Sequence, residues 1–293
     1  IIDSFLFMNN SHIIIGYGNW AKKIIKFLKR NNFFSRIIVV TSKKQFFIFP
    51  NYKKIDRKDL NNIFLKAKSV HICSNNQSHF SYIKKFVILN KNIIVEKPFI
   101  NSQKELKNIN KIIKKNKKKI LVNYTDLFNP FFPKIKKIFN NNLNNRIYLN
   151  VIYSKHDKKF KKKYQCINEW LDHPLSIIIE LFKSFPKFKI ISFKSIYRNK
   201  IMNEELEVQY KLKNISISFL ITNMNKKKRI VSIKTLKKNY FFDLNSHLIK
   251  NNKSSFYNLY KNLNKINKSK SSFDLSFHKK IFKEKLKIIN KLN

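Results

Sequence analysis

The chain of 293 residues contains only two glycines, and both lie within one short segment, at Gly16 and Gly18. Ordinary usage would give about 20 glycines in a chain of this length. An apolar run over residues 11–15 precedes them, and in residues 19–28 the apolar side chains recur with the spacing of one helix face. The sequence therefore predicts a buried strand, a tight glycine turn and an amphipathic helix, which is the opening unit of a parallel α/β sheet.

The turn itself has the pattern G-x-G-x-x-A. In a dinucleotide-binding turn the first glycine makes the tight turn, and the second lets backbone N–H groups approach the pyrophosphate at the helix N-terminus. Ala21 supplies the small residue that helix–strand packing needs at the last position. We therefore predict that a dinucleotide cofactor contacts Gly16, Gly18, Asn19 and Trp20. The alternative is an ordinary turn between a strand and a helix.

The chain divides into two parts of different character. Up to residue 122, short apolar runs alternate with helix-like segments, which predicts a Rossmann domain with a parallel sheet covered on both faces. Beyond this point one apolar helix is surrounded by longer alternating strands, which predicts an α+β domain with an open, largely antiparallel sheet. We therefore predict an α/β protein with two domains, residues 1–122 and 123–293. The expected strands are residues 11–15, 36–40, 46–49, 69–73, 92–95, 119–122, 146–154, 188–197, 206–213, 215–222, 229–235 and 240–244, and the expected helices are residues 19–28, 59–66, 78–89, 102–115, 170–182, 255–266 and 276–292.

The net charge is +47, from 63 Lys and Arg against 16 Asp and Glu. Taken alone, this charge would favour a nucleic-acid-binding protein. The residues in excess, Lys, Asn, Ile, Phe and Tyr, all have A+T-rich codons, and the lysines are spread through every segment. An A+T-rich genome therefore explains the composition, and we expect no specific nucleic-acid partner. Nucleic-acid binding remains the less favoured alternative.

The sequence indicates no metal site, no transmembrane helix and no signal peptide. The two cysteines, Cys73 and Cys166, and the seven histidines show no metal-ligand spacing, so we expect no metal. No apolar run approaches the ~18 residues of a transmembrane helix. Residues 1–8 lack the basic start and the cleavage site of a signal peptide. We therefore expect a cytoplasmic protein with reduced thiols and no membrane partner.

The segment after the second expected strand bears on the choice of cofactor. A carboxylate at this point would bind the ribose 2′-hydroxyl of NAD, but the sequence continues Thr41-Ser42-Lys43-Lys44. A hydroxyl followed by cations suits a 2′-phosphate better. We therefore predict that NADP(H) is favoured over NAD(H), with Ser42 and Lys43 in contact with the cofactor. The abundance of lysine in this chain is the alternative explanation.

Residues 70–98 contain V-H-I-C-S-N-N-Q-S-H followed by N-I-I-V-E-K-P. This stretch resembles the pattern V-x-I-x-T-P-x-x-x-H and E-K-P of the Gfo/Idh/MocA oxidoreductases (glucose–fructose oxidoreductase, inositol dehydrogenase and relatives). The resemblance implies a Rossmann domain followed by a domain with an open sheet. It also implies that the cofactor site includes Ser74, Asn75, His79, Glu96 and Lys97.

Lys97 is the residue that the resemblance implies as catalytic, beside the nicotinamide. An ammonium group near a hydroxyl or carbonyl carbon can polarise it and relay its proton. Lys97 precedes Pro98 at the end of an expected buried strand, where solvated lysines are unusual. We therefore predict that Lys97 exchanges a proton with the substrate.

Two later segments extend the resemblance. Residues 124–130, Y-T-D-L-F-N-P, resemble the Y-T-H-L-F-x-P segment of sugar-acting members, and residues 164–176 resemble a D-x-G-x-H-D segment. In the second segment Glu169 and His173 are four residues apart, which places them on one face if the segment is helical. The resemblance implies that His173 and Glu169 are catalytic. It implies further substrate contacts by Tyr124, Asp126 and Asp172.

These residues together predict an NAD(P)-dependent oxidoreductase. It would transfer a hydride between the nicotinamide cofactor and a hydroxyl or carbonyl carbon of a small molecule resembling a sugar or polyol. Analogy with the family implies a homo-oligomer. Leu127 and Leu171 depart from the family pattern. These departures keep a second hypothesis open, a catalytically decayed protein that binds a cofactor or acts as a scaffold.

Overall fold

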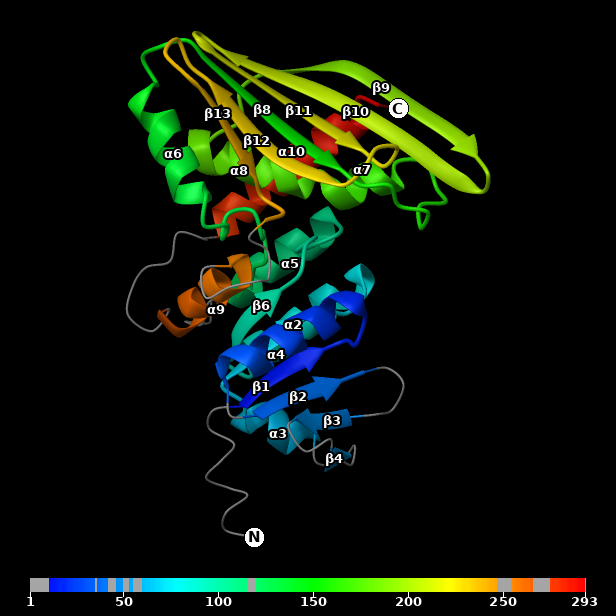
Figure 1. Ribbon diagram of the computed structural model, residues 1–293. Helices are drawn as coiled ribbons and strands as arrows, with labels where there is room; N and C mark the ends of the chain where they lie inside the picture. The colour runs from blue at the N-terminus through cyan, green and yellow to red at the C-terminus, as the bar shows by residue number, and fades with distance from the viewer. Residues whose placement is uncertain are drawn as a thin grey trace. The chain divides into compact units, whose positions relative to one another are not determined.

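The computed structural model describes residues 11–34, 36–41, 46–49, 53–54, 60–114, 120–246, 254–265 and 275–292. They form two compact units (Figure 1). Unit 1 comprises residues 1–123 and 259–275, and unit 2 comprises residues 124–258 and 276–293. Each unit contains one of the two sheets, so each is built around its own apolar core.

Unit 1 has a seven-stranded sheet with the order β4-β3-β2-β1-β5-β6-β7. Its five parallel strands are almost wholly buried, which is typical of a sheet with helices on both faces. The chain extends the sheet first to one side of β1 and then to the other, so β1 lies at the point where the strand order reverses. The strands are β1 (Ser11–Ile15), β2 (Arg36–Val40), β5 (Ser69–Ile72), β6 (Asn92–Val95) and β7 (Ile120–Val122), with β3 (Phe46–Phe49) and β4 (Lys53–Lys54) as an antiparallel edge; the helices are α2 (Asn19–Asn31), α3 (Leu60–Lys66), the 3-10 turn η3 (Asn76–Ser78), α4 (His79–Ile88) and α5 (Gln103–Lys114).

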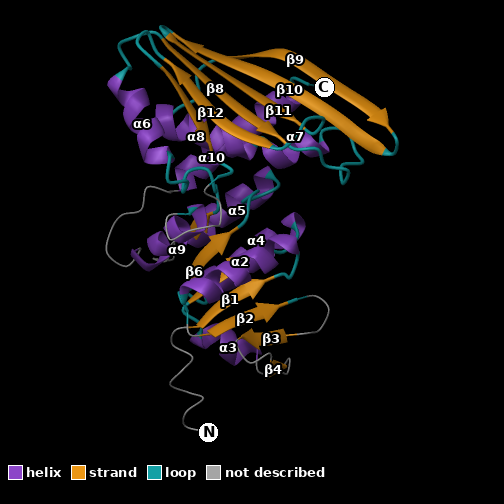
Figure 2. Ribbon diagram, in the orientation of Figure 1, coloured by secondary structure: helices purple, strands orange, loops and turns teal. Residues whose placement is uncertain are grey.

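Unit 2 has a six-stranded sheet with the order β13-β12-β8-β11-β10-β9, in which only β8 and β11 pair in parallel. Buried and partly exposed side chains alternate along β11, as expected for a sheet covered on one face. Figure 2 shows the helices of this unit gathered on that one face. The predicted fold class, with one parallel and one largely antiparallel sheet, is confirmed. The strands are β8 (Ile147–Ser154), β9 (Phe188–Arg198), β10 (Ile201–Leu212), β11 (Ile215–Thr222), β12 (Lys228–Lys234) and β13 (Asn239–Asp243), and the helices are α6 (Phe132–Asn141), α7 (Gln165–Trp170), α8 (Asp172–Phe182) and α10 (Leu275–Asn290).

Helix α9 (Ser255–Lys265) corrects the predicted domain division. The prediction assigns all residues after 123 to one domain, but residues 259–275 belong to unit 1. Tyr260 is fully buried there, with its hydroxyl 2.6 Å from Nδ1 of His71 and its ring beside those of His12 and Phe34. The sequence could not show this, because the amphipathic pattern of a helix does not identify the surface that its apolar face meets.

No helix in the described part of the chain combines the length and the hydropathy that crossing a bilayer requires.

One buried carboxylate fixes the start of α7. Glu204 in β10 is fully buried, and its side chain accepts hydrogen bonds from the backbone N–H groups of Tyr164, Cys166 (2.9 Å) and Ile167 (3.4 Å). These groups lie at a helix start, where the backbone itself provides no acceptor. Since α7 carries Glu169 and leads into α8, Glu204 helps to place the predicted site residues of both helices.

Replacing Glu204 with alanine leaves these N–H groups buried without an acceptor. We expect Glu204→Ala to lower the free energy of unfolding by about 2–4 kcal/mol, measured by urea denaturation. Glu205→Ala is the matched control, since the neighbouring side chain points to the other face of the strand and its removal should change stability by less than about 0.5 kcal/mol. An equal loss in both variants would contradict the anchoring role.

Candidate active site

The predicted site residues fall into two groups, one in each unit. In unit 1 they lie at the carboxyl edge of the parallel sheet, where Gly16, Cys73, Glu96 and Asn123 directly follow β1, β5, β6 and β7. Each of these residues donates its backbone N–H to the last residue of the neighbouring strand, with N to O distances of 2.7–3.0 Å. This edge is where open α/β sheets bind their ligands.

The two glycines have different structural roles. Gly16 has φ +101°, and a Cβ at this position would lie 2.8 Å from the carbonyl oxygen of Cys73 and 3.0 Å from Cα of Ser74. Gly16 is therefore required by the close approach of the chain after β1 to the chain after β5. At Gly18 the backbone is extended, and a Cβ would meet nothing within 4 Å. Only Gly18 faces open space.

The N-terminus of α2 fits an anionic group. Gly18 is its N-cap residue and has no side chain to cap the first N–H groups, and the first turn contains no acidic residue. Uncapped N–H groups at the positive end of a 13-residue helix are suited to a phosphate. The residues expected to contact a dinucleotide, Asn19 and Trp20, occupy this first turn. Ser42 and Lys43, expected at the 2′-phosphate, lie outside the described residues.

The carboxylate of Glu96 is held in place by several donors. Asn123 Nδ2 donates to Glu96 Oε1 at 2.7 Å, and His71 Nε2 lies 3.0 Å from the same oxygen. Burial alone would raise the pKa of Glu96, but the hydrogen bonds from His71, Asn123 and Trp20 hold it below its usual range. The half-buried Lys97 follows Glu96 directly in the chain.

Ser74, Asn75 and His79 form the turn after β5. The side chain of Asn75 accepts a hydrogen bond from the backbone N–H of Ser78 at 3.1 Å, and the Ser78 hydroxyl donates to that of Ser74 at 2.6 Å. His79 is fully buried, with its ring nitrogens 2.9 Å from the carbonyl oxygen of Pro98 and 3.1 Å from that of Ser74. His79 therefore joins the two loops that follow β5 and β6.

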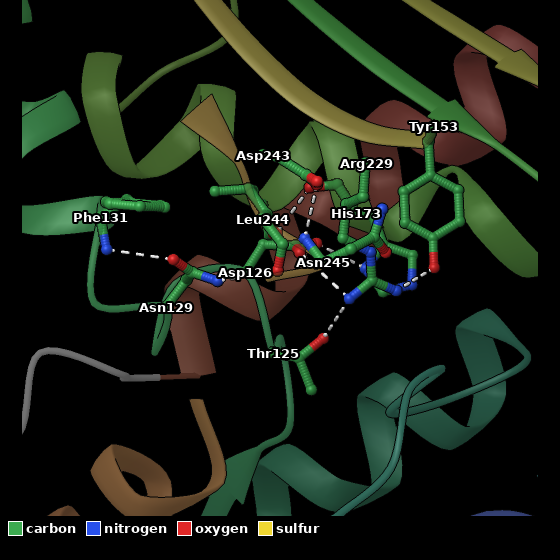
Figure 3. A network of polar contacts seen from close by, with 11 residues as sticks. Thr125, Asp126, Asn129, Phe131, Tyr153, His173, Arg229, Asp243, Leu244 and Asn245 are labelled. Carbon is green, nitrogen blue, oxygen red and sulfur yellow. Dashed lines mark hydrogen bonds and ion pairs between the residues drawn. The ribbon is translucent and has the colours of Figure 1, made fainter. Parts of the chain in front are cut away.

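In unit 2 the structure brings together Asp126 and His173. Both side chains are buried, and Nδ1 of His173 lies 2.7 Å from Oδ2 of Asp126 (Figure 3). An ionised carboxylate can only accept, so Nδ1 carries the proton in this pair. Asp126 therefore sets the tautomer of His173. The sequence predicted both residues as site residues but not their pairing.

Arg229 and Tyr153 complete this network, and the sequence did not predict either of them. The register of β12 against β8 pairs Arg229 with Tyr153. The guanidinium lies 3.3 Å from Oδ1 of Asp126, donates to Thr125 Oγ1 at 3.2 Å and also donates to the Tyr153 hydroxyl (Figure 3). The Tyr153 ring stacks on the His173 ring, with centroids 4.3 Å apart.

The charged groups in this network shift the pKa values of their neighbours. Burial alone would lower the pKa of Arg229, but the charge of Asp126, together with Tyr153 and Asp243, raises it. Burial raises the pKa of Tyr153, although the neighbouring Arg229 acts in the opposite direction. One signal for Arg229 was present in the sequence. In a chain whose basic residues are mostly lysines, a retained arginine stands out in the same way as a retained glycine.

Other predicted residues of unit 2 have different partners. Glu169 in α7 forms an ion pair with the exposed Lys159. Asp172 is buried, and its Oδ1 lies 3.1 Å from Nζ of Lys285 in α10. Tyr124 is buried as well, with its hydroxyl 3.4 Å from Nδ1 of His278, and burial raises its pKa. The contacts of Asp172 and Tyr124 therefore join them to α10.

Comparison with known proteins identifies the class of unit 1. Residues 11–124 match the sequence model of the oxidoreductase family with an NAD-binding Rossmann fold, GFO_IDH_MocA. The resemblance found in the sequence motifs is thereby confirmed, with the match extending over residues 11–124. A search of the curated proteins gives no match.

Solved structures share the fold along almost the whole chain. UDP-N-acetylglucosamine 3-dehydrogenase GnnA from Acidithiobacillus ferrooxidans is 12% identical with a TM-score of 0.74, covering 95% of this chain and 96% of that chain. A candidate NADPH-dependent oxidoreductase from Desulfitobacterium hafniense is 13% identical with a TM-score of 0.78, covering 97% and 96%. A candidate myo-inositol dehydrogenase from Sinorhizobium meliloti is 12% identical with a TM-score of 0.75, covering 93% and 94%. At such identities the likeness shows the fold alone.

The different roles of the glycines predict different effects of alanine. We expect Gly16→Ala to lower the free energy of unfolding by about 1–3 kcal/mol, because the methyl group meets the Cys73 carbonyl and the backbone conformation disfavours a side chain. Gly18→Ala should change it by less than about 0.5 kcal/mol, since its Cβ meets nothing. Urea denaturation of both variants measures this difference. Equal destabilisation would refute the separate roles.

The buried ion pair of Asp172 predicts a large effect of neutralising its partner. Lys285→Met leaves the Asp172 carboxylate buried without its cation, and we expect the free energy of unfolding to fall by about 3–5 kcal/mol. The control is Lys283→Met on the same helix, an exposed lysine whose loss should have an effect below about 1 kcal/mol. Thermal and urea unfolding of the two variants test the prediction. Similar stability of both variants would show that Asp172 does not depend on Lys285.

Proposed function

We propose that the protein transfers a hydride between NADP(H) and a hydroxyl or carbonyl carbon of a sugar or polyol-like substrate. The observation that carries the proposal is the arrangement at the carboxyl edge of the unit 1 sheet. There the uncapped start of α2 comes after β1, and the fixed carboxylate of Glu96, followed by Lys97, comes after β6. Both strands belong to one parallel sheet. The family match of residues 11–124 supports the same assignment.

Different segments of unit 1 would bind different parts of the cofactor. The first turn of α2 holds the diphosphate, and Gly18 keeps side-chain atoms away from it. A bound nicotinamide dinucleotide supplies the acceptor or the donor of the hydride. The sequence Thr41-Ser42-Lys43-Lys44 supports NADP(H), because it offers hydroxyls and cations where NAD would need a carboxylate. One solved structure of the same fold is described as NADPH-dependent, in agreement with this choice.

Proton transfer is assigned to Lys97. In the oxidative direction the carbinol carbon loses its hydrogen as a hydride, and the hydroxyl proton passes to the neutral amine of Lys97. In the reductive direction the Lys97 ammonium returns that proton to the carbonyl oxygen.

The network of unit 2 is assigned to orienting the substrate oxygen. Asp126 holds His173 in one tautomer, so Nε2 is the ring atom that bonds the substrate. Arg229 forms an ion pair with Asp126, and Tyr153 fixes the plane of the imidazole by stacking on it. Glu169 is retained as a further candidate, since its charge is close enough to act on Tyr153.

The proposal is tested by binding and turnover measured on the same purified protein. We expect NADPH to bind at least tenfold more tightly than NADH in a fluorescence titration, and Gly18→Ala to weaken NADPH binding at least tenfold. Turnover is measured as NADPH absorbance against a panel of polyols, aldoses and sugar nucleotides. Lys97→Met and Asp126→Asn should each lower kcat about 100-fold or more, with the Kd for NADPH nearly unchanged.

Lys107→Met serves as the control, because this lysine is exposed on α5 and should leave kcat and Kd as in the wild type. Turnover that survives in Lys97→Met would refute the assignment of the proton relay. Tight NADPH binding without turnover on any member of the panel would favour the decayed, cofactor-binding alternative. DNA binding with sequence preference would revive the nucleic-acid hypothesis.

A further inference from the structure

Three potential metal ligands meet at the carboxyl edge of the unit 1 sheet. His71 and Cys73 are two residues apart at the end of β5, so their side chains point to the same face of the sheet. Strand β6 pairs in parallel with β5, and the backbone N–H of Glu96 donates to the carbonyl of Ile72 at 3.0 Å. As a result one ligand atom from each of His71, Cys73 and Glu96 lies within 4.8 Å of the others.

We propose that His71, Cys73 and Glu96 bind a divalent cation of the zinc class. An imidazole nitrogen, a thiolate and a carboxylate are the three kinds of ligand that proteins offer to zinc. Three protein ligands leave the fourth position of a tetrahedral site open for water or for an oxygen of a small molecule. This site shares Glu96 with the proposed cofactor site, but its test requires neither NADP(H) nor turnover.

The surrounding contacts are those that a metal-binding histidine and carboxylate require. The Tyr260 hydroxyl lies 2.6 Å from Nδ1 of His71, which leaves Nε2 pointing to the cluster. Asn123 holds Glu96 through a hydrogen bond of 2.7 Å. Such outer contacts orient metal ligands and raise metal affinity. A bound cation would replace the present contact of 3.0 Å between His71 Nε2 and Glu96 Oε1 with two bonds to itself.

The charges of the cluster also favour a cation. A divalent cation stabilises the thiolate of a coordinating cysteine and neutralises the negative charges of the thiolate and the Glu96 carboxylate. Bond lengths of about 2.0–2.3 Å place two ligand atoms roughly 3.5 Å apart in a tetrahedral site. The thiol therefore has to approach by about 1 Å, which a rotation of the half-buried Cys73 side chain supplies.

The sequence alone argued against a metal, because residues 71, 73 and 96 do not form a familiar ligand spacing. The pleat of β5 and its pairing with β6 create the cluster, so ligand spacing along the chain is the wrong criterion for this site.

Cobalt is the probe that tests the site, because a cobalt–thiolate bond absorbs in the near ultraviolet. We expect metal-free protein titrated with Co²⁺ to develop this absorption at one equivalent, with visible bands of a four-coordinate ion, and Zn²⁺ to remove both. Cys73→Ser should abolish the thiolate absorption. Glu96→Gln should weaken Co²⁺ binding at least tenfold, and Tyr260→Phe should weaken it about tenfold while keeping the absorption.

Cys166→Ser is the matched control, since Cys166 is buried in unit 2 and its removal should leave the cobalt spectrum unchanged. Far-ultraviolet circular dichroism of each variant confirms that it is folded. The proposal is overturned if folded wild-type protein gives no thiolate absorption with Co²⁺. It is also overturned if the absorption persists in Cys73→Ser or disappears in Cys166→Ser.

Discussion

The close approach of the chain after β1 to the chain after β5 is the constraint on which the site of unit 1 depends. It brings the backbone of Gly16 so near to Cys73 that no side chain fits between them. Hydrogen bonds continue from this point along the sheet edge, from Cys73 to Ile15, from Glu96 to Ile72 and onward to β7. The first turn of α2, the Glu96 carboxylate and the cluster around His71 are all positioned by this edge.

Unit 2 depends on a different kind of interaction, a buried set of compensating charges. Asp126 has His173 on one oxygen and Arg229 on the other, so its negative charge is stabilised although it is almost completely buried. The negative charge of the buried Asp172 is likewise stabilised, by Lys285 on α10. Because a buried ion that loses its partner is strongly destabilising, both arrangements hold their helices and strands in one register.

The unusual composition of the chain affected how much of the site could be predicted. Glycine is so scarce in this chain that the retained pair at 16 and 18 indicated the cofactor turn, and E-K-P indicated the end of β6. Lysine is so common that only Lys43 and Lys97 were singled out, and Lys285 was therefore missed. Tyr124 and Asp172 were predicted from a local motif, but their partners lie on α10, far away in the sequence.

The amino-acid sequence by itself determined most of the order of strands and helices, though not β4, α6 and α7, together with the parallel sheet of the first unit and the place of its glycine turn. It could do so because these features follow from local periodicity and from the steric demands of single residues. Only the tertiary structure decided that Tyr260 packs against His71, that Arg229 meets Asp126, and that His71, Cys73 and Glu96 form one cluster. These contacts depend on strand register and helix packing, which join residues up to 189 positions apart and leave no local pattern.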